Sequence, residues 1–234
     1  MEGLKALIFD VDGTLAETEE LHRQAFNRTF QDFGLDWHWS VDTYRDLLKT
    51  AGGKERLRVW RDRVGARVSD ATITELHKEK TGHYGRLMSE AGVRLRPGIA
   101  DLMDFARKNG LKRAIATTTN RPNVDALCLA AFGRPAQDLF DTIAAGDEVP
   151  AKKPAPDVYL LALERLEVAA GEAIAFEDSR IGVLSAKAAG LRVIAAPSLY
   201  TTSDRLDEAD LTAPALSLEL VREASAFFSG AFSG

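Results

Sequence analysis

The sequence has almost no cysteine, no long uncharged apolar run and no excess of positive charge. The single cysteine, Cys128, excludes a disulfide framework and a cysteine-rich zinc site, and it favours a reducing compartment such as the cytoplasm. No apolar stretch is long enough to span a membrane, and the first predicted strand begins too early to leave room for a signal peptide. The net charge of −5 disfavours nucleic acid or an anionic membrane as the main partner. We therefore expect a cytoplasmic monomer that acts on a small molecule.

The stretch from Leu4 to Leu15 organises the rest of the chain. An apolar run over 4–9 predicts a strand buried on both faces, and two carboxylates, Asp10 and Asp12, follow it directly. Residues two apart in an extended chain point the same way, so both carboxylates can face the crevice beyond the end of a parallel strand. The alternative is a hairpin, because Asp-Gly is a turn signal. The helical periodicity after Leu15 disfavours that alternative.

The remaining sequence alternates between helical and strand patterns in a way that predicts the fold class. Helical patterns alone cover 19–33, 41–49, 54–64 and 71–90. From 97 onward, short apolar runs alternate with helices, which is typical of a parallel sheet. We therefore expect an α/β fold with a Rossmann-like, doubly wound parallel sheet as its core and an inserted all-helical cap domain. The expected strands are 111–117, 140–144, 173–176, 192–196 and a short one near 211, and the expected helices between and after them are 97–108, 121–131, 157–166, 179–189 and 218–228.

The insertion divides the predicted domains. The core comprises residues 1–15 and 94–234, and the cap comprises residues 16–93. A helical insertion that is joined to the core beside a crevice is well placed to act as a lid. Three aromatic residues of the cap, Trp37, Trp39 and Trp60, are expected to pack between its helices rather than to contact a ligand.

Polar side chains stand at the ends of several predicted strands. Asp10 and Asp12 follow the first strand, Thr117 ends the second, and Glu177 and Asp178 follow the fourth. Clustered carboxylates repel one another unless a cation neutralises them, and Mg²⁺ with oxygen ligands suits a site that also binds phosphate. The expected ligands are Asp10, the backbone carbonyl of Asp12, and Asp178, with Glu177 assisting.

The same crevice would also bind the phosphate itself. Lys153 and the hydroxyl of Thr117 are the expected phosphoryl contacts, the amide of Thr118 at a helix start is a further donor, and Lys152 is the second choice for the lysine. Each of these features has a structural alternative. Acidic residues can simply cap the helix that begins near Ser179, and a lysine pair can be a solvated surface feature.

Taken together, these motifs resemble those of the haloacid dehalogenase superfamily, in order and in spacing. The matching segments are Asp10-Val11-Asp12-Gly13-Thr14, Thr117, Lys153-Pro154 and Glu177-Asp178. The resemblance implies that Asp10 is a nucleophile that becomes an aspartyl phosphate. It also implies that Asp12 protonates the leaving oxygen and then activates water, with Mg²⁺ as cofactor. Dehalogenases lack a carboxylate at the position of Asp12, so its presence indicates a phosphate ester as substrate.

Within the superfamily, the chain resembles the β-phosphoglucomutase and CbbY-like branch. Its cap segment 44–56 is similar to that of CbbY-type sugar-bisphosphate phosphatases. That resemblance implies hydrolysis of xylulose-1,5-bisphosphate, an inhibitor of the Calvin cycle enzyme Rubisco. A second phosphate would require positive charge in the cap, and Gly52, Gly53, Lys54 and Arg56 supply flexible amides and cations there. Two further residues, Glu17 and His22, are expected to contact the substrate.

Two other functions stay open at this point. A β-phosphoglucomutase-like mutase would pass the phosphate to a second sugar phosphate instead of to water. The mutase pattern expects an arginine in the loop that here contains Gly52-Gly53-Lys54, which disfavours this alternative. A non-catalytic phosphate sensor that binds a partner enzyme would need none of the chemically competent side chains that the motifs retain. A phosphoric monoester hydrolase is therefore the preferred interpretation.

Overall fold

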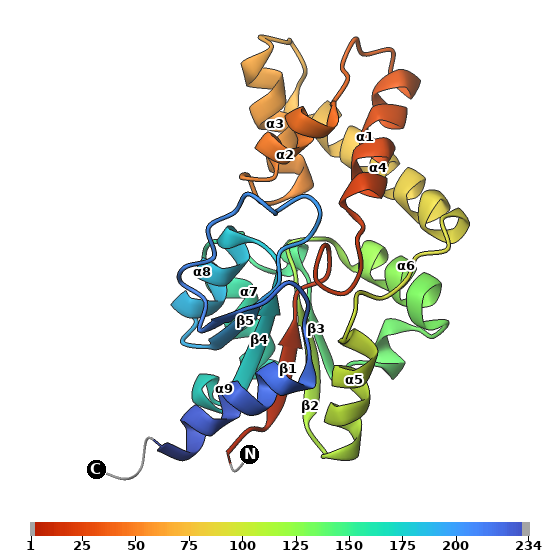
Figure 1. The fold of residues 1–234 in the computed structure, drawn as a ribbon. Helices are drawn as coiled ribbons and strands as arrows, with labels where there is room; N and C mark the ends of the chain where they lie inside the picture. Colours follow the sequence, from red (N-terminus) through yellow and green to blue (C-terminus); the bar gives the residue numbers. More distant parts are fainter. Residues whose placement is uncertain (1–2, 231–234) are drawn as a thin grey trace.

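The computed structural model describes residues 3–230, with side chains up to residue 225. The outer ends of the predicted core domain, residues 1–2 and 231–234, lie outside the described residues. Figure 1 shows two bodies, one built around a sheet and the other formed by helices alone. None of the described helices is long and apolar enough to cross a membrane.

A parallel sheet of six strands forms the centre of the larger body, in the order β3-β2-β1-β4-β5-β6. β1 lies in the middle, where Ile8 is in register with Ala114 of β2 on one side and with Ala175 of β4 on the other. All four residues of β1 are buried, as the continuous apolar run predicts. The fold class is confirmed. The strands are β1 (Ala6–Phe9), β2 (Lys112–Ala116), β3 (Thr142–Ala144), β4 (Ala173–Glu177), β5 (Arg192–Ala195) and β6 (Leu211–Thr212).

Helices cover both faces of this sheet. Leu7 and Phe9 pack with residues of α5, α6 and α9, whereas Ala6 and Ile8 pack with residues of α7 and α8. The alternation follows from the two-residue period of a strand. Cys128 of α6 is buried in the first of these clusters. The helices are α5 (Ile99–Lys108), α6 (Arg121–Phe132), α7 (Asp157–Leu166), α8 (Arg180–Ala188) and α9 (Leu218–Gly230), with short 3₁₀ turns η1 (Ala136–Asp138), η2 (Gly146–Glu148) and η3 (Ala170–Glu172).

The second body consists of α1 to α4, and we call it the cap. An aromatic cluster fills its interior: the Trp39 ring lies 4.5 Å from Phe26 and 5.0 Å from Phe30, centroid to centroid. Trp37 and Trp60 pack against the same cluster, so the predicted packing role of the three tryptophans is confirmed. The cap helices are α1 (Glu19–Asp32), α2 (Val41–Leu47), α3 (Gly53–Arg63) and α4 (Asp70–Glu90).

Two linkers join the cap to the core and lie side by side. Ala16 in the first linker forms an antiparallel bridge with Leu95 in the second, and the amide of Arg96 donates to the carbonyl of Leu15 at 2.8 Å. The loop after β5, drawn in blue in Figure 1, rises from the core toward the cap. Its Tyr200 donates a hydrogen bond to Glu20 of α1, and its ring lies 5.8 Å from that of Tyr44. The cap therefore contacts the core at the linkers, at this loop and where α4 packs on α6, beside which Asn120 donates a hydrogen bond to Thr81 at 3.2 Å.

Candidate active site

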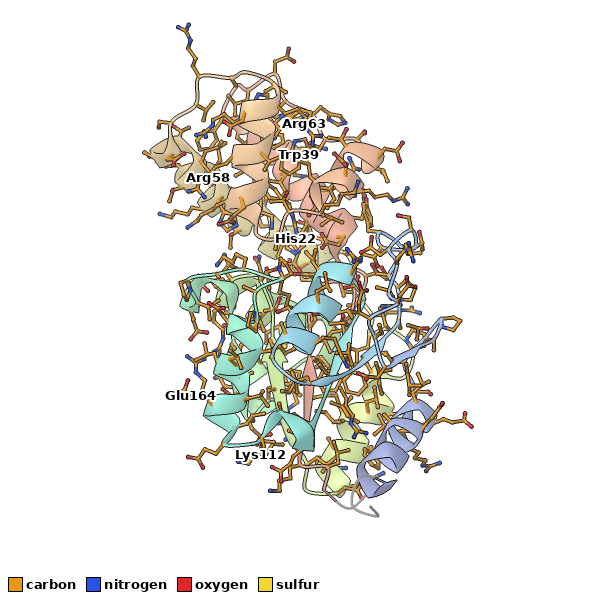
Figure 2. The ribbon with its side chains drawn as sticks, turned by 90° about the vertical axis from the view of Figure 1, so that its left-hand side faces the viewer. His22, Trp39, Arg58, Arg63, Lys112 and Glu164 are labelled. Carbon is orange, nitrogen blue, oxygen red and sulfur yellow. The ribbon has the colours of Figure 1, made fainter. Side chains whose placement is uncertain are left out.

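A cleft of about 1250 Å³ lies between the cap and the carboxyl ends of β1, β2 and β4. In a sheet of this order the strand connections change direction at β1, and ligands of open α/β sheets bind beyond the strand ends at such a point. Figure 2 shows His22 at the boundary between the two bodies. The structure brings most of the predicted site residues to this cleft. They are Asp10, Asp12, His22, Gly52, Gly53, Lys54, Arg56, Thr117, Thr118, Lys152, Lys153 and Asp178.

Lys153 forms the buried centre of the cleft floor. Its ammonium lies 2.7 Å from Asp10 Oδ1 and 2.6 Å from Glu177 Oε1, and it donates to the carbonyl of Ala116 at 3.0 Å. Burial opposes a charge on Lys153, but the two carboxylates outweigh it and hold the pKa above its ordinary value. Tyr159 of α7 donates a further hydrogen bond to Glu177 Oε1 at 2.6 Å. Of the two candidate lysines, Lys153 is the one that contacts the carboxylates.

Three carboxylates on this floor fit a divalent cation. Asp10, Glu177 and Asp178 are all buried, and each offers an oxygen within 4.8 Å of the others. Lys153 supplies one positive charge for them, which leaves the group short of positive charge. Burial raises the pKa of Asp10 to about 8, and burial together with Asp10 raises the pKa of Asp178 well above its ordinary value. Hard oxygen donors with surplus negative charge are the donor set that Mg²⁺ prefers.

The turn after β1 packs tightly against this acidic group. Gly13 has a φ of +83°, and a Cβ there would lie 2.2 Å from Asp178 Oδ2. Only glycine tolerates both the left-handed backbone and the close approach. The preceding carbonyl, that of Asp12, stays a predicted metal ligand.

Asp12 faces the cap, in contrast to Asp10. Its Oδ1 accepts a hydrogen bond from Thr18 Oγ1 at 2.6 Å and lies 2.9 Å from His22 Nε2. Lys80 of α4 bonds to the other ring nitrogen of His22, and the Tyr84 ring stacks on His22 at 4.0 Å. Thr18 lies at the N-cap position of α1, but its side chain binds Asp12 and caps no helix amide.

This arrangement fixes the protonation of the pair. Burial lowers the pKa of His22, Asp12 opposes this effect and Lys80 adds to it, and the net lowering favours a neutral ring. Lys80 donates to Nδ1, and Nε2–H therefore donates to Asp12. Burial would raise the pKa of Asp12, but the contacts with His22, Thr18 and Lys80 outweigh it and hold the pKa below its usual range. Asp12 is thus ionised at the edge of the cap.

The loop after β2 lines the cleft next to Lys153. Thr117 is buried, and its hydroxyl accepts a hydrogen bond from the amide of Thr119 at 3.2 Å. Helix α6 begins at Arg121 with Asn120 as its N-cap, so the amide of Thr118 lies before the helix start rather than at it. Both threonines line the cleft, but the helix-start argument for Thr118 does not apply.

The glycine pair of the cap has a clear packing reason. A Cβ on Gly53 would lie 2.6 Å from His77 Nε2, and one on Gly52, at a φ of +90°, would lie 2.1 Å from the Glu55 carboxylate. The Arg56 side chain is hydrogen-bonded within the cap. Its Nε donates to the carbonyl of Thr50 at 2.9 Å and its Nη1 to the Tyr44 hydroxyl at 3.0 Å. These contacts favour a role in shaping the loop for Arg56.

Lys54 is the cap cation best placed for a ligand. Two other cations on the rim, Arg45 and Lys49, have acidic partners on the same helix or next to it, at 3.5 and 2.9 Å. Lys54 is half-buried, lines the cleft and takes part in no ion pair with any described residue.

Glu17 is the predicted site residue that the structure places elsewhere. It lies in a separate groove behind the linkers, where its carboxylate pairs with Arg96 at 3.2 Å and accepts from the amide of Leu199 at 3.1 Å. We therefore withdraw the predicted substrate contact of Glu17. Glu177 is completely buried and does not line the cleft, although its carboxylate lies within 4.8 Å of oxygens of Asp10 and Asp178.

Several residues of the site were not predicted. Glu19 is buried, lines the cleft and accepts a hydrogen bond from Tyr44 at 2.8 Å, although in the sequence it reads as a first-turn acid of α1. In the sequence, nothing distinguishes Lys80 from the other lysines of its long helical pattern. Only the fold places it beside His22. Tyr159 likewise gains its role only from the fold, which places its hydroxyl beside Glu177. A buried lysine or tyrosine has no signature in the sequence apart from its position on the apolar face of a helix.

Comparisons with known proteins agree with this fold. Residues 4–190 match the family of haloacid dehalogenase-like hydrolases. Protein CbbY of Rhodobacter capsulatus is 58% identical over 214 residues, which cover 92% of this chain and 94% of that protein. The crystal structure of CbbY from Rhodobacter sphaeroides in complex with phosphate is similar with a TM-score of 0.88 and 50% identity, and covers 91% of this chain and 94% of that one. A mutant of the same protein in complex with xylulose-1,5-bisphosphate gives a TM-score of 0.88 and 49% identity, with the same coverage.

Proposed function

Because this chain belongs to the haloacid dehalogenase-like hydrolase family, we propose that it is a Mg²⁺-dependent phosphatase that acts on a phosphorylated sugar. The proposed substrate is xylulose-1,5-bisphosphate, the sugar bound to the similar mutant structure. The cleft offers Lys153 for one phosphate and Lys54, on the opposite body, for the other. The reaction would run through a phosphorylated Asp10, with free phosphate as product.

In the first step, Asp10 attacks the phosphorus atom. The carboxylate lies on the cleft floor with Lys153 at 2.7 Å, and the lysine's charge stabilises the transferring phosphoryl group. A bound Mg²⁺, held by Asp10, Asp178, Glu177 and the Asp12 carbonyl, would neutralise negative charge on the phosphate and the acids. Asp12 gives its proton to the leaving sugar oxygen. The doubly charged phosphate raises the pKa of Asp12 when it binds, which loads that proton.

In the second step, Asp12 returns to the ionised form and removes a proton from water. The hydrogen bonds from Thr18 and His22 favour this ionised form. The water attacks the phosphorus of the acyl phosphate, and Asp10 leaves as a carboxylate. His22 orients Asp12 and does not itself exchange the proton.

One observation carries the proposal. Two carboxylates only two residues apart have opposite surroundings: Asp10 is held by a buried lysine, and Asp12 by hydrogen-bond donors at the cap. Such a division suits a nucleophile that lies beside positive charge, where a bound Mg²⁺ would join Lys153 in favouring the carboxylate, and an acid-base group that gains and loses a proton.

The test is a direct assay of wild type and Asp10→Asn. With Mg²⁺ and xylulose-1,5-bisphosphate, we expect wild type to release one phosphate per sugar, while Asp10→Asn, of nearly equal shape, loses about 10⁴-fold or more in rate. Product analysis separates the alternatives. An isomerised sugar phosphate without free phosphate would indicate a mutase, and equal phosphate release by Asp10→Asn would exclude the covalent mechanism.

Lys54→Ala tests the cap assignment. We expect its KM for the bisphosphate to rise about tenfold, with little change in the hydrolysis of p-nitrophenyl phosphate, because only the bisphosphate has a second phosphate to bind. Lys78→Ala removes the same charge from an exposed position of α4 outside the cleft and serves as control. Equal effects of the two changes would contradict a contact between Lys54 and the distal phosphate.

A further inference from the structure

Arg96 is a largely buried arginine in the second linker of the cap, and its side chain is only 10% exposed. Its guanidinium donates to three backbone carbonyls on two different loops. Nη1 donates to the carbonyl of Gly13 and, at 2.9 Å, to that of Ala196, and Nη2 donates to that of Pro197 at 2.8 Å. A side chain from the cap linker thus joins the loop after β1 to the loop after β5.

The first of these loops carries Asp12. The peptide between Asp12 and Gly13 is oriented by the Gly13 amide, which donates to the carbonyl of Ala16 at 2.9 Å. The next peptide, between Gly13 and Thr14, is oriented by Arg96, which donates to its carbonyl oxygen. Both peptides of the turn are therefore fixed from the linker side.

The second loop supports Asp178. Thr201 lies on it, and its hydroxyl is 2.8 Å from the carbonyl of Asp178 and 3.1 Å from its Oδ2. The two loops meet at Gly13, which has no room for a Cβ between itself and Asp178. A change in the spacing of the loops would therefore move Asp12 relative to Asp178.

The charge of Arg96 is balanced at the same place. Glu17 from the first linker pairs with Arg96 Nε at 3.2 Å, and its other oxygen accepts from the amide of Leu199 at 3.1 Å. One guanidinium and one carboxylate thus connect both linkers with both loops. A groove of about 670 Å³ borders this pair.

We infer that Arg96 is a positioning residue for the hydrolysis, which sets the spacing between Asp12 and Asp178 by bridging the loops after β1 and β5. The inference rests on the proposed function, because it concerns the same reaction. Arg96 touches no reacting atom and acts through the Gly13, Ala196 and Pro197 carbonyls. The planar fork of a guanidinium reaches several carbonyls at once, and a lysine ammonium on a flexible stem cannot reproduce that geometry.

The experiment measures kcat and KM of Arg96→Ala and Arg96→Lys with Mg²⁺, on xylulose-1,5-bisphosphate and on p-nitrophenyl phosphate. We expect both variants to lose about 100-fold in kcat with KM changed less than threefold, since misplacement by about 1 Å has effects of this size. Guanidinium at about 20 mM, far below the molar concentrations that unfold proteins, should restore about tenfold in kcat to Arg96→Ala. It should restore nothing to Arg96→Lys, whose side chain still fills the site.

The rescue separates positioning from a purely structural role. A loss of stability alone would lower the fraction of folded protein and would leave the kcat of the folded fraction, and its response to guanidinium, as in wild type. Arg94→Ala, an exposed arginine two residues away, is the matched control. If Arg96→Ala does not fold, as judged by circular dichroism, the kcat of Arg96→Lys alone tests the expected 100-fold loss.

Either of two results would overturn the inference: a folded variant with kcat within twofold of wild type, or a loss in Arg96→Ala that guanidinium does not reverse. The proposed function fails separately, if wild type hydrolyses p-nitrophenyl phosphate but no sugar phosphate. In that case the aryl ester still tests Arg96.

Discussion

The core side and the cap side of the cleft give two neighbouring carboxylates opposite surroundings. Asp10 contacts Lys153, which comes from the core, whereas Asp12 contacts Thr18, His22 and Tyr84, which come from the first linker and the cap. Burial raises the pKa of Asp10, while the cap donors lower that of Asp12 despite its burial. The two acids of one short motif are therefore exposed to different bodies of the protein.

This division has a consequence for cap movement. Lys153, the partner of Asp10, belongs to a loop of the core, so it would keep its place if the cap moved. His22 and Tyr84, partners of Asp12, belong to α1 and α4 and would move with the cap.

The largest effect is expected for Lys153→Met on the core side. Without the ammonium, Asp10 and Glu177 keep no positive partner in the metal-free protein, and removing one partner of a buried ion pair costs about 3–5 kcal/mol. We expect unfolding in urea to show this loss and the phosphatase rate to fall by about 10³-fold or more. Lys152→Met, at a half-buried position, is the control for stability and should change the free energy of unfolding by less than about 0.5 kcal/mol. Equal destabilisation by both variants would contradict the assignment of the buried cation to Lys153.

A smaller effect is expected for His22→Ala on the cap side. The change removes a hydrogen bond to the ionised Asp12, so the pKa of Asp12 should rise toward its ordinary value. We expect kcat to fall about 10- to 100-fold. The acidic limb of its pH profile, where Asp12 must be ionised to act as base, should move to higher pH. His38→Ala, at an exposed position of the cap, should change neither. A lowered kcat with an unmoved acidic limb would show that His22 does not act through Asp12.

The raised pKa of Asp10 predicts how magnesium binding depends on pH. Asp10 is protonated below a pKa of about 8 in the metal-free protein, and a proton competes with the metal for the carboxylate. The apparent dissociation constant of Mg²⁺ should therefore fall by about tenfold per pH unit between about pH 6 and 8. Titration calorimetry measures it. We expect Asp10→Asn to bind Mg²⁺ more weakly and to lose most of this pH dependence.

The same group affects stability without metal. The folded protein holds a proton on Asp10 that the unfolded chain has already released above its ordinary pKa of 3.8, so the contribution of Asp10 falls as pH rises toward 8. His22 and Lys80 have lowered pKa values, in contrast to Asp10, but they are present in wild type and in Asp10→Asn and contribute equally to both. The difference in melting temperature between the two proteins should therefore shift in favour of Asp10→Asn as pH rises. A constant difference would contradict the raised pKa.

The core side of the cleft could be predicted from the sequence more fully than the cap side. The fold and the core side follow from local patterns: a strand buried on both faces, followed at once by Asp10 and Asp12, and a second one followed by Asp178. Parallel strands bring their carboxyl ends to one edge, so the acids meet without knowledge of any distant contact. The expected helices and strands agree with those observed to within a few residues for this reason.

The cap side could not be predicted in the same way. Glu17 and Glu19 stand two residues apart, and which of them faces the cleft depends on where α1 begins relative to the linker. Lys80 meets His22 only because α4 packs on α1, 58 residues further along the chain. Arg96 finds its carbonyls on loops from both halves of the core. Contacts between distant helices and loops leave no short-range pattern in a sequence.

The smallest effect, and the one that separates the two sides best, is expected from a pair of hydroxyl deletions. Tyr159→Phe removes the hydrogen bond to Glu177 and keeps the ring, so it should lower the free energy of unfolding by about 1–2 kcal/mol and weaken Mg²⁺ binding severalfold. The pH profile of kcat should not move, because Tyr159 does not contact Asp12. Tyr84→Phe removes a long hydrogen bond of 3.4 Å to Asp12 and should shift the acidic limb slightly while leaving Mg²⁺ affinity unchanged. If either variant altered both the Mg²⁺ affinity and the acidic limb, the two carboxylates would be coupled through the metal site, and the separation of core and cap control would be wrong.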